Sequence, residues 1–244
     1  MNEYDIIAPF YDIEHARFNE DLDMYRNFAE LSGGTILELA SGSGRVLLPL
    51  ARAGHAITGV DSSANMLEIA RQQAQTEGLI PRVTLVQQDI AHLQLGRKFR
   101  MAFIALGSFA HLITRTQQQE TLEAIRSHMS KGGTFIIDIS NADAHYLEDL
   151  GGHVLHQGTW KRDDGSMLTH FISPAAATDQ HMLEMNTSMS STPRAGRCYA
   201  RSSPHTCICS SAAKWNCCLS KQASPSSISS VTMISAPFNS TVPE

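Results

Sequence analysis

The chain has 244 residues, a formal net charge of −5 and 42% hydrophobic residues, which suits one large α/β domain or a domain with an insertion. The negative charge argues against nucleic-acid binding as the main function. The longest uncharged run, residues 101–114, is shorter than the roughly 20 residues that cross a bilayer, and the acidic N-terminus does not resemble a secretory signal. We therefore expect a soluble, cytoplasmic protein whose oligomeric state the sequence leaves open.

The last 57 residues differ in composition from the rest of the chain. They hold five Lys or Arg and one acid, which leaves a net charge of −9 on the first 187 residues. They also contain all five cysteines and 15 of the 26 serines. An odd cysteine count in one segment argues against a disulfide framework, and the cysteine spacings lack the two-residue gap of zinc knuckles. We expect no metal site.

The predicted elements alternate along the first 140 residues. Residues 3–31 show helical spacing of aromatic and apolar positions and predict one or two helices over a ligand cleft. After them the expected strands are 35–39, 56–60, 82–87, 100–105 and 134–139, and the expected helices are 44–53, 62–77 and 117–130. This order predicts an α/β fold: a Rossmann-like, doubly wound, mostly parallel sheet with helices on both faces.

Residues 142–187 lose this alternation and read as short strands at 154–157, 159–161, 167–172 and 182–185. Asp163-Asp164-Gly165 is a hairpin signal. We expect a small antiparallel β insertion after the fifth parallel strand.

The segment Thr35–Val46 predicts a strand, a tight loop and a helix start. Gly42 and Gly44 let the backbone approach a ligand where a Cβ atom would clash. Asp61 follows Gly44 by seventeen residues, at the end of the second strand, where an acid can accept the hydroxyls of a ribose. The sequence therefore predicts an adenosine-containing cofactor. Leu47 stands where the dinucleotide fingerprint has its third glycine, which disfavours NAD.

Four ordered motifs and an N-terminal pair carry a family resemblance. The motifs are Glu38-x-x-x-Gly42-x-Gly44, Gly59–Leu67, Gln88-Asp89-Ile90 and Lys131–Asp138, and the pair is Tyr4-Asp5 with Tyr11-Asp12. Over roughly residues 1–187 the chain resembles the small-molecule branch of the class I S-adenosylmethionine-dependent methyltransferases. The resemblance implies methyl transfer from S-adenosylmethionine to an N or O atom of a small molecule, with the 142–187 strands forming part of a substrate lid.

The resemblance also implies roles for the residues around the glycine loop. Glu38 would hold the methionine ammonium, directly or through water. The backbone at Ala40, Gly42 and Gly44 would face the amino-acid half of the cofactor, and Tyr11 would close over it. Ala40 stands where family members often have another small residue, which leaves the loop plausible.

The nucleoside half of the cofactor would lie on later residues. By resemblance, Asp61 with Ser62 would take the ribose hydroxyls, Met66 would lie against adenine, and Asp89 with Ile90 would read the adenine edge. Each has a simpler alternative. Asp61 and Ser62 could form only a helix cap, and Met66 and Ile90 could be ordinary core residues.

Two residues after the fourth strand are candidates for the methyl-transfer side. By resemblance, Leu106 would lie beneath the transferred methyl group, although it could also be apolar packing. His111 is the candidate catalytic residue, as a general base for an amine or hydroxyl acceptor. A structural role is the alternative for a single histidine in this position.

The resemblance stops after Thr187, and residues 188–244 read as an aberrant or disordered tail. Translation in a shifted frame offers an explanation. The third base of each codon, read with the first two of the next, turns Lys214–Leu219 into a run containing Glu-Leu-Leu, and permits Gly-Asp-Tyr-Asp for part of Ser230–Asn239. These match the family's ending, so we expect a frameshifted gene with no final pair of strands and low activity. Sequencing the gene around codons 187–190 tests this.

The expected domains are a cofactor-binding unit over 1–141, the lid over 142–187 and the tail over 188–244. Two other functions remain open: a nicotinamide-dependent oxidoreductase on the same fold, and a module that binds S-adenosylmethionine without turnover. The identity of the acceptor is also open.

Overall fold

The computed structural model describes residues 3–15, 18–140, 153–174, 182–192, 199–208 and 228–236. Its first half contains α1 (Glu3–His15), α2 (Leu22–Ser32), β1 (Ile36–Leu39), α3 (Leu47–Arg52), β2 (Ile57–Asp61), α4 (Ala64–Thr76), β3 (Val83–Gln87), the 3-10 turn η1 (Ile90–His92), β4 (Phe99–Ile104), the 3-10 turn η2 (Ser108–His111), α5 (Arg115–His128) and β5 (Met129–Ser140). The second half contains β6 (Leu155–Lys161), β7 (Met167–Pro174), β8 (Met182–Thr192), β9 (Tyr199–Ile208) and β10 (Ile228–Ala236).

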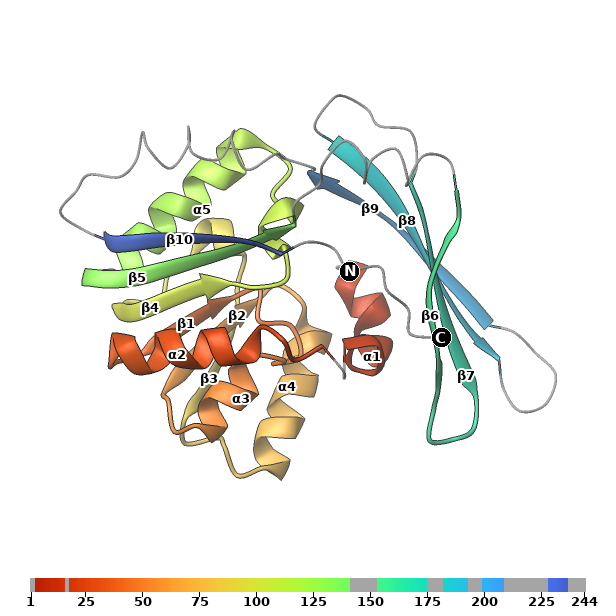
Figure 1. The fold of residues 1–244 in the computed structure, drawn as a ribbon, viewed down its shortest axis with the longest axis horizontal. Helices are drawn as coiled ribbons and strands as arrows, with labels where there is room; N and C mark the ends of the chain where they lie inside the picture. Colours follow the sequence, from red (N-terminus) through yellow and green to blue (C-terminus); the bar gives the residue numbers. More distant parts are fainter. Residues whose placement is uncertain are drawn as a thin grey trace.

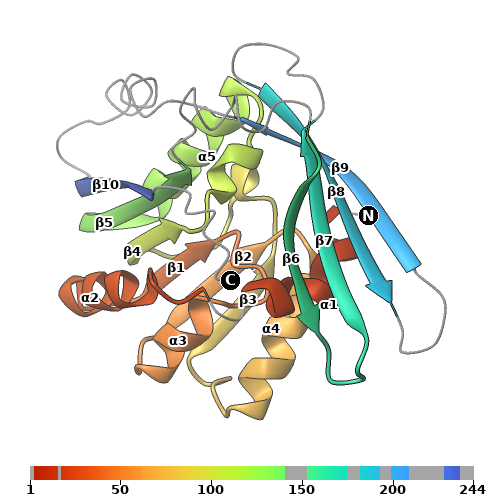
Figure 2. The same ribbon diagram turned by 45° about the vertical axis from the view of Figure 1, so that its right-hand side comes forward.

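These strands form two sheets. One has six strands in the order β10-β5-β4-β1-β2-β3, and each neighbouring pair in it is parallel. The other has four antiparallel strands in the order β6-β7-β8-β9. In both views α1 lies between the two sheets (Figures 1 and 2). The predicted Rossmann-like fold with an antiparallel insertion is confirmed.

The central strands of the parallel sheet are buried on both faces. Ile36 of β1 packs in a cluster with α2 and α3, whereas the next residue, Leu37, packs in a cluster with α5. Met101 and Ala102 of β4 divide between the two faces in the same way. Parallel strands that are covered by helices on both faces need such continuous apolar runs. These strands could therefore be predicted from the sequence.

Two local predictions need correction. The helix expected at 44–53 begins only at Leu47, because Gly44 has φ of +93°, in the left-handed region that a helix cannot contain. The strand expected at 134–139 begins earlier, at Met129, and its register with β4 shifts between Phe99 and Met101.

The antiparallel sheet is larger than predicted. The strands expected at 154–157 and 159–161 are one strand, β6, and β8 continues past residue 187 to Thr192. The predicted hairpin is present: the Arg162 N–H donates to the Ser166 carbonyl oxygen at 2.8 Å, and Gly165 has φ of +79°. Because β9 also joins this sheet, the antiparallel insertion extends to residue 208, beyond the expected boundary at 187.

The prediction that residues from about 188 onward do not form the final pair of strands needs correction, because one strand, β10, does join the parallel sheet. β9 pairs with β8, and β10 pairs with β5 in parallel, so β5 is not an exposed edge. β10 has a sequence reason: Ile228, Val231, Thr232 and Ile234 are β-branched residues within an otherwise serine-rich segment. The expected irregular tail is therefore interrupted by strands, whereas the frameshift itself, a property of the gene, stays a prediction.

Some predictions fall outside the described residues. These include the expected boundary at 141–142 and every cysteine except Cys207. Within the described ranges, every helix falls short of the length and apolar character that a bilayer-crossing helix needs.

Candidate functional site

A pocket opens at the carboxyl ends of β1 and β4, two neighbouring strands that pair from Ile36 with Met101 to Leu39 with Ile104. The chain leaves β1 toward β2 and β3 on one side and reaches β4 and β5 on the other, so this is the switch point at which such sheets bind ligands. Residues lining the pocket are Tyr11, Glu38, Ala40, Ser41, Gly42, Arg45, Val46, Ala105, Leu106 and Ser108. Five of these, Tyr11, Glu38, Ala40, Gly42 and Leu106, are among the predicted site residues.

The loop after β1 is shaped by residues with positive φ. Ala40 and Gly42 both have φ of +54°. Gly59 of the neighbouring β2 makes room for this loop, because a Cβ atom there would lie 2.4 Å from Leu47 Cδ1 and 2.8 Å from Ser41 Oγ. Leu47 is fully buried against β2, so its side chain fills the place of the diphosphate glycine.

Glu38 is the buried acid of this pocket. Its side chain is 2% exposed, and its Oε2 atom has no hydrogen-bond partner among the described residues. Burial raises the pKa of Glu38 well above its ordinary value, and the nearby Arg45 guanidinium only partly opposes this. A buried carboxylate oxygen without a partner is costly, and a ligand cation such as an ammonium group would satisfy it.

Asp61 stands at the end of β2 and braces the glycine loop. Its Oδ2 accepts the Gly42 N–H and its Oδ1 accepts the Ser63 N–H, both at 2.8 Å. Burial raises the pKa of Asp61, while these backbone donors lower it. Ser63 is the N-cap of α4, and Ser62 is exposed. Asp61 could therefore bind ribose hydroxyls or serve only the start of α4. Both roles are compatible with this geometry, because each carboxylate oxygen can accept a second hydrogen bond.

The predicted adenine contacts lie outside the pocket lining. Met66 is 1% exposed on α4, as a core residue would be. Asp89 is exposed and caps η1 by accepting the Ala91 N–H at 2.9 Å, and Ile90 packs against the cluster beneath α5. Gly44 also lies outside the lining. A cofactor role for these residues stays a prediction.

Helix α1 covers the pocket and is tied down by the aspartates of the two Tyr-Asp pairs. Asp5 accepts from Ser63 Oγ at 2.6 Å. Asp12 accepts from Ser43 Oγ and from Gln73 Nε2, the latter at 2.6 Å. These bonds hold α1 against the glycine loop and α4, with Tyr11 in the pocket wall.

His111 lies at the end of η2, beside the start of α1. The Tyr4 hydroxyl is 2.8 Å from its Nε2 atom, and the two rings meet edge to face with centroids 5.4 Å apart. His111 does not line the pocket. A role as general base stays a prediction, and Tyr4 is a partner that the sequence did not suggest for it.

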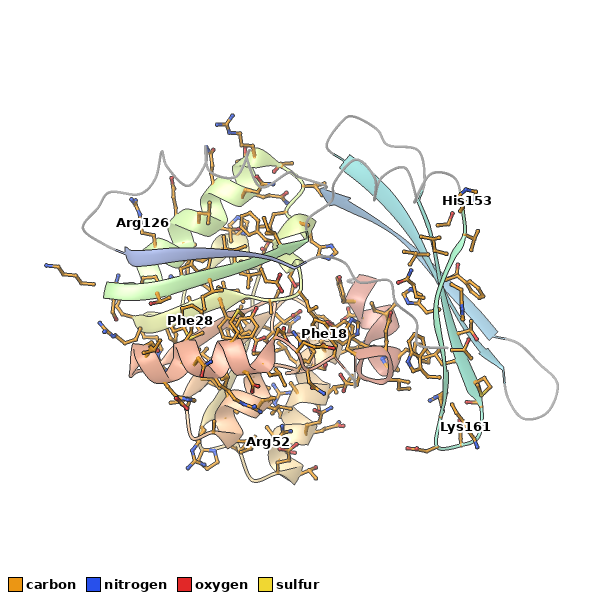
Figure 3. The ribbon with its side chains drawn as sticks, in the orientation of Figure 1. Phe18, Phe28, Arg52, Arg126, His153 and Lys161 are labelled. Atoms are coloured by element: carbon orange, nitrogen blue, oxygen red, sulfur yellow. The ribbon has the colours of Figure 1, made fainter. Side chains whose placement is uncertain are left out.

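Sequence reasoning missed Arg45, which lines the pocket. It forms two hydrogen bonds to Asp21, of 2.7 and 2.6 Å, and its guanidinium lies 5.0 Å from the centre of the ring of Phe18, labelled in Figure 3 where the chain passes from α1 to α2. Arg45 therefore fastens the segment before α2 to the glycine loop. Its place directly after Gly44 was the available signal. No group of three metal-ligating side chains occurs in the part of the chain that the structure describes.

Comparison with known proteins shows a methyltransferase domain in this chain. Residues 36–133 match the methyltransferase domain family. The chain is 27% identical over 141 residues to the dTDP-3-amino-3,6-dideoxy-alpha-D-glucopyranose N,N-dimethyltransferase of Streptomyces fradiae, covering 54% of this chain and 52% of that protein. It is 35% identical over 103 residues to the 2-phytyl-1,4-naphtoquinone methyltransferase of a Nostoc species, covering 37% of this chain and 43% of the relative. The chain thus spans about half the length of the curated relatives it matches.

Solved structures show the same fold over most of the chain. DesVI of Streptomyces venezuelae aligns with a TM-score of 0.71 at 18% identity, covering 91% of this chain and 89% of DesVI. An S-adenosylmethionine-dependent methyltransferase of Clostridium acetobutylicum aligns with a TM-score of 0.69 at 22% identity, covering 90% and 87%. The family match over β1–β5 and the four ordered motifs agree with this shared fold. Residues 36–133 thus match a methyltransferase domain, and the chain shares its fold with a solved S-adenosylmethionine-dependent methyltransferase.

Proposed function

We propose that this protein transfers a methyl group from S-adenosylmethionine to an N or O atom of a small molecule. The observation that carries the proposal is the buried Glu38 carboxylate at the edge of the pocket between β1 and β4, whose Oε2 lacks a partner among the described residues. This group fits the ammonium of the cofactor's methionine half. The neighbouring Ala40 and Gly42 offer the open backbone that a closely held ligand needs.

The methyl-transfer reaction requires mainly aligned reactants and a site from which water is excluded. When bound, S-adenosylmethionine supplies an electrophilic methyl group whose sulfur leaves as a neutral thioether. The protein therefore has to hold the two reactants in line and exclude water. Glu38 and Asp61 would orient the cofactor, and Tyr11 on α1 would shield it.

An amine is the acceptor that we propose first. Glu38 is a carboxylate, and Arg45, the one cation among the described lining residues, is already bound to Asp21. An anionic acceptor group would therefore meet no available positive charge in the described lining. Two relatives are named as N-methyltransferases of sugars, the Streptomyces fradiae enzyme and KedS8 of Streptoalloteichus. His111 would take the proton that the methylated amine releases. We place this activity in the cytoplasm, on a small molecule rather than on nucleic acid, in keeping with the net charge of −5.

Calorimetric titration with S-adenosylhomocysteine and with NAD tests the cofactor. We expect binding of the first and none of the second, because Leu47 fills the diphosphate-glycine position. Binding of NAD alone would favour the oxidoreductase instead.

Mass-spectrometric assay of methyl transfer to a panel of amino sugar nucleotides, beginning with dTDP-3-amino-3,6-dideoxyglucose, then tests turnover. Tight cofactor binding without transfer to any amine or hydroxyl compound would leave the non-catalytic binding module as the function.

A further inference from the structure

The pocket lies between two loops that share an unusual backbone feature. One loop follows β1 and the other follows β4. Each contains a non-glycine residue with positive φ: Ala40 at +54° and Leu106 at +50°. No other non-glycine residue in the described ranges has this conformation. It costs about 1–2 kcal/mol per residue, so both loops need an outside contact to hold it.

Each loop is held by a carboxylate from the strand beyond it. Asp61 at the end of β2 accepts the Gly42 N–H at 2.8 Å, and Asp138 on β5 accepts the Leu106 N–H at 2.9 Å through Oδ2. In the sheet, β2 flanks β1 on one side and β5 flanks β4 on the other. Asp138 thus occupies, for the loop after β4, the place that Asp61 occupies for the cofactor loop.

The hydrogen bond from the Leu106 N–H to Asp138 holds the turn that directs the loop after β4. Leu106 and Gly107, with φ of +50° and +64°, are successive left-handed residues that turn the chain from β4 into η2. Directly after them, Ser108 lines the pocket and its Oγ donates to the Ala105 carbonyl oxygen at 2.8 Å. The same turn places His111 beside Tyr4. A change at Leu106 therefore moves the groups on this side of the pocket together.

Asp138 has an environment that suits a bracing role. It is half-buried, and burial raises its pKa, as does the charge of Asp21, while the Leu106 N–H lowers it. A hydrogen bond in such a low-dielectric place is stronger than one in water. Ile104 of β4 pairs with Ile137 of β5. This register places the Asp138 carboxylate next to Leu106.

We propose that Asp138 is a positioning residue for the acceptor side of the pocket: by accepting the Leu106 N–H it holds the Leu106–Gly107 turn, and so aligns the acceptor with the methyl group. The inference rests on the proposed function for its effect on rate. Asp138 should act on kcat, whereas Asp61, its counterpart, should act on cofactor affinity.

The experiment compares Asp138→Ala, Asp138→Asn and Asp61→Ala in the full chain. Asp138→Ala should lower kcat for the amine that the wild-type protein methylates by at least about tenfold, because a small misplacement of the reactants lowers the reaction rate strongly. The same variant should change S-adenosylhomocysteine affinity less than about twofold. Asp138→Asn should retain most of the rate, since its amide oxygen can still accept the Leu106 N–H. In a Leu106→Gly background the Asp138→Ala effect should shrink, because glycine adopts positive φ without strain.

Hydrogen exchange measured by mass spectrometry separates this inference from the proposed function. Asp138→Ala should speed exchange in residues 105–111 and leave 40–44 unchanged, whether or not an acceptor is turned over. Absence of turnover in the wild-type protein would overturn the proposed function. The same exchange pattern would still support the role of Asp138 in holding the Leu106–Gly107 turn. Unchanged exchange at 105–111, an Asp138→Asn variant as impaired as Asp138→Ala, or an equal loss of cofactor affinity would each overturn it. Thermal unfolding of the three variants shows whether a general loss of folding mimics these results.

Discussion

The loops on the two sides of the pocket are built alike and encoded differently. The loop after β1 bends at Ala40 and at its two glycines, 42 and 44, and Asp61 on β2 accepts the Gly42 N–H. The loop after β4 contains Gly107 but places its bend on Leu106, whose N–H depends on Asp138, 32 residues later in the chain. The cofactor side is thus largely a local property of the sequence, whereas the acceptor side depends on a contact between strands. Variants on each side of the pocket should therefore differ in what they impair, cofactor affinity or turnover.

The largest effect is expected for Glu38→Ala on the cofactor side. Removing one partner of a buried ion pair costs about 3–5 kcal/mol, so the affinity for S-adenosylhomocysteine should fall by a factor of about a hundred or more. Isothermal titration calorimetry measures this. Glu77→Ala, which removes a more exposed glutamate paired with Arg52, is the matched control and should bind normally. An affinity unchanged in Glu38→Ala would show that the ammonium is held elsewhere.

On the acceptor side, His111→Ala should lower turnover by about a hundredfold while cofactor affinity stays the same, if His111 is a general base. Steady-state kinetics with the identified acceptor and titration with S-adenosylhomocysteine give the two readouts. His92→Ala, at an exposed histidine on η1, is the control and should be fully active. Parallel losses of stability and activity in His111→Ala would support a packing role beside Tyr4 instead.

Asp61→Ala should weaken S-adenosylhomocysteine binding by about 1.5–3 kcal/mol, the range for hydrogen bonds to a charged group. The loss has two sources, the ribose contact and the brace on Gly42. Ser62→Ala, at the exposed neighbouring position, should have little effect. If both variants bind alike, Asp61 serves only the start of α4.

The smallest effect is a pH dependence of cofactor binding. The pKa of Glu38 is raised by burial, so in the ligand-free protein its ionisation is unfavourable, and its contribution to stability declines as pH rises from the ordinary value through the raised pKa. Binding an ammonium favours the ionised form. Affinity should therefore increase with pH, by at most about tenfold per pH unit below that pKa, with proton release on binding.

Titrations at about pH 6 and about pH 8, in buffers with different ionisation heats, detect that release. Glu38→Gln should remove most of the slope, although Asp61 and Asp138, whose pKa values are also raised by burial, can leave a remainder. A slope that is the same in Glu38→Gln would assign it to those two residues.

The order of strands and helices in the first 140 residues was predictable because each element has a signal in its own stretch of sequence. The buried run of β4 is an example, and it is found as expected. The start of α3 was misjudged because the positive φ of Gly44 belongs to the loop and not to the helix. β10 was missed because a short serine-rich strand is stabilised by pairing with β5, a partner nearly a hundred residues away in sequence.

Apolar periodicity, glycines and an acid at a strand end are local signals, so the parallel sheet, the glycine loop and Asp61 could be predicted from the sequence. Glu38 and Tyr11 were named by the family resemblance. Three features could be seen only in the folded chain: Glu38 Oε2 has no partner among the described residues, Arg45 is bound to Asp21, and Asp138 accepts the Leu106 N–H. The physical reason is that hydrogen-bond satisfaction and burial depend on which strands become neighbours, and strand order is settled by the whole fold rather than by any one segment.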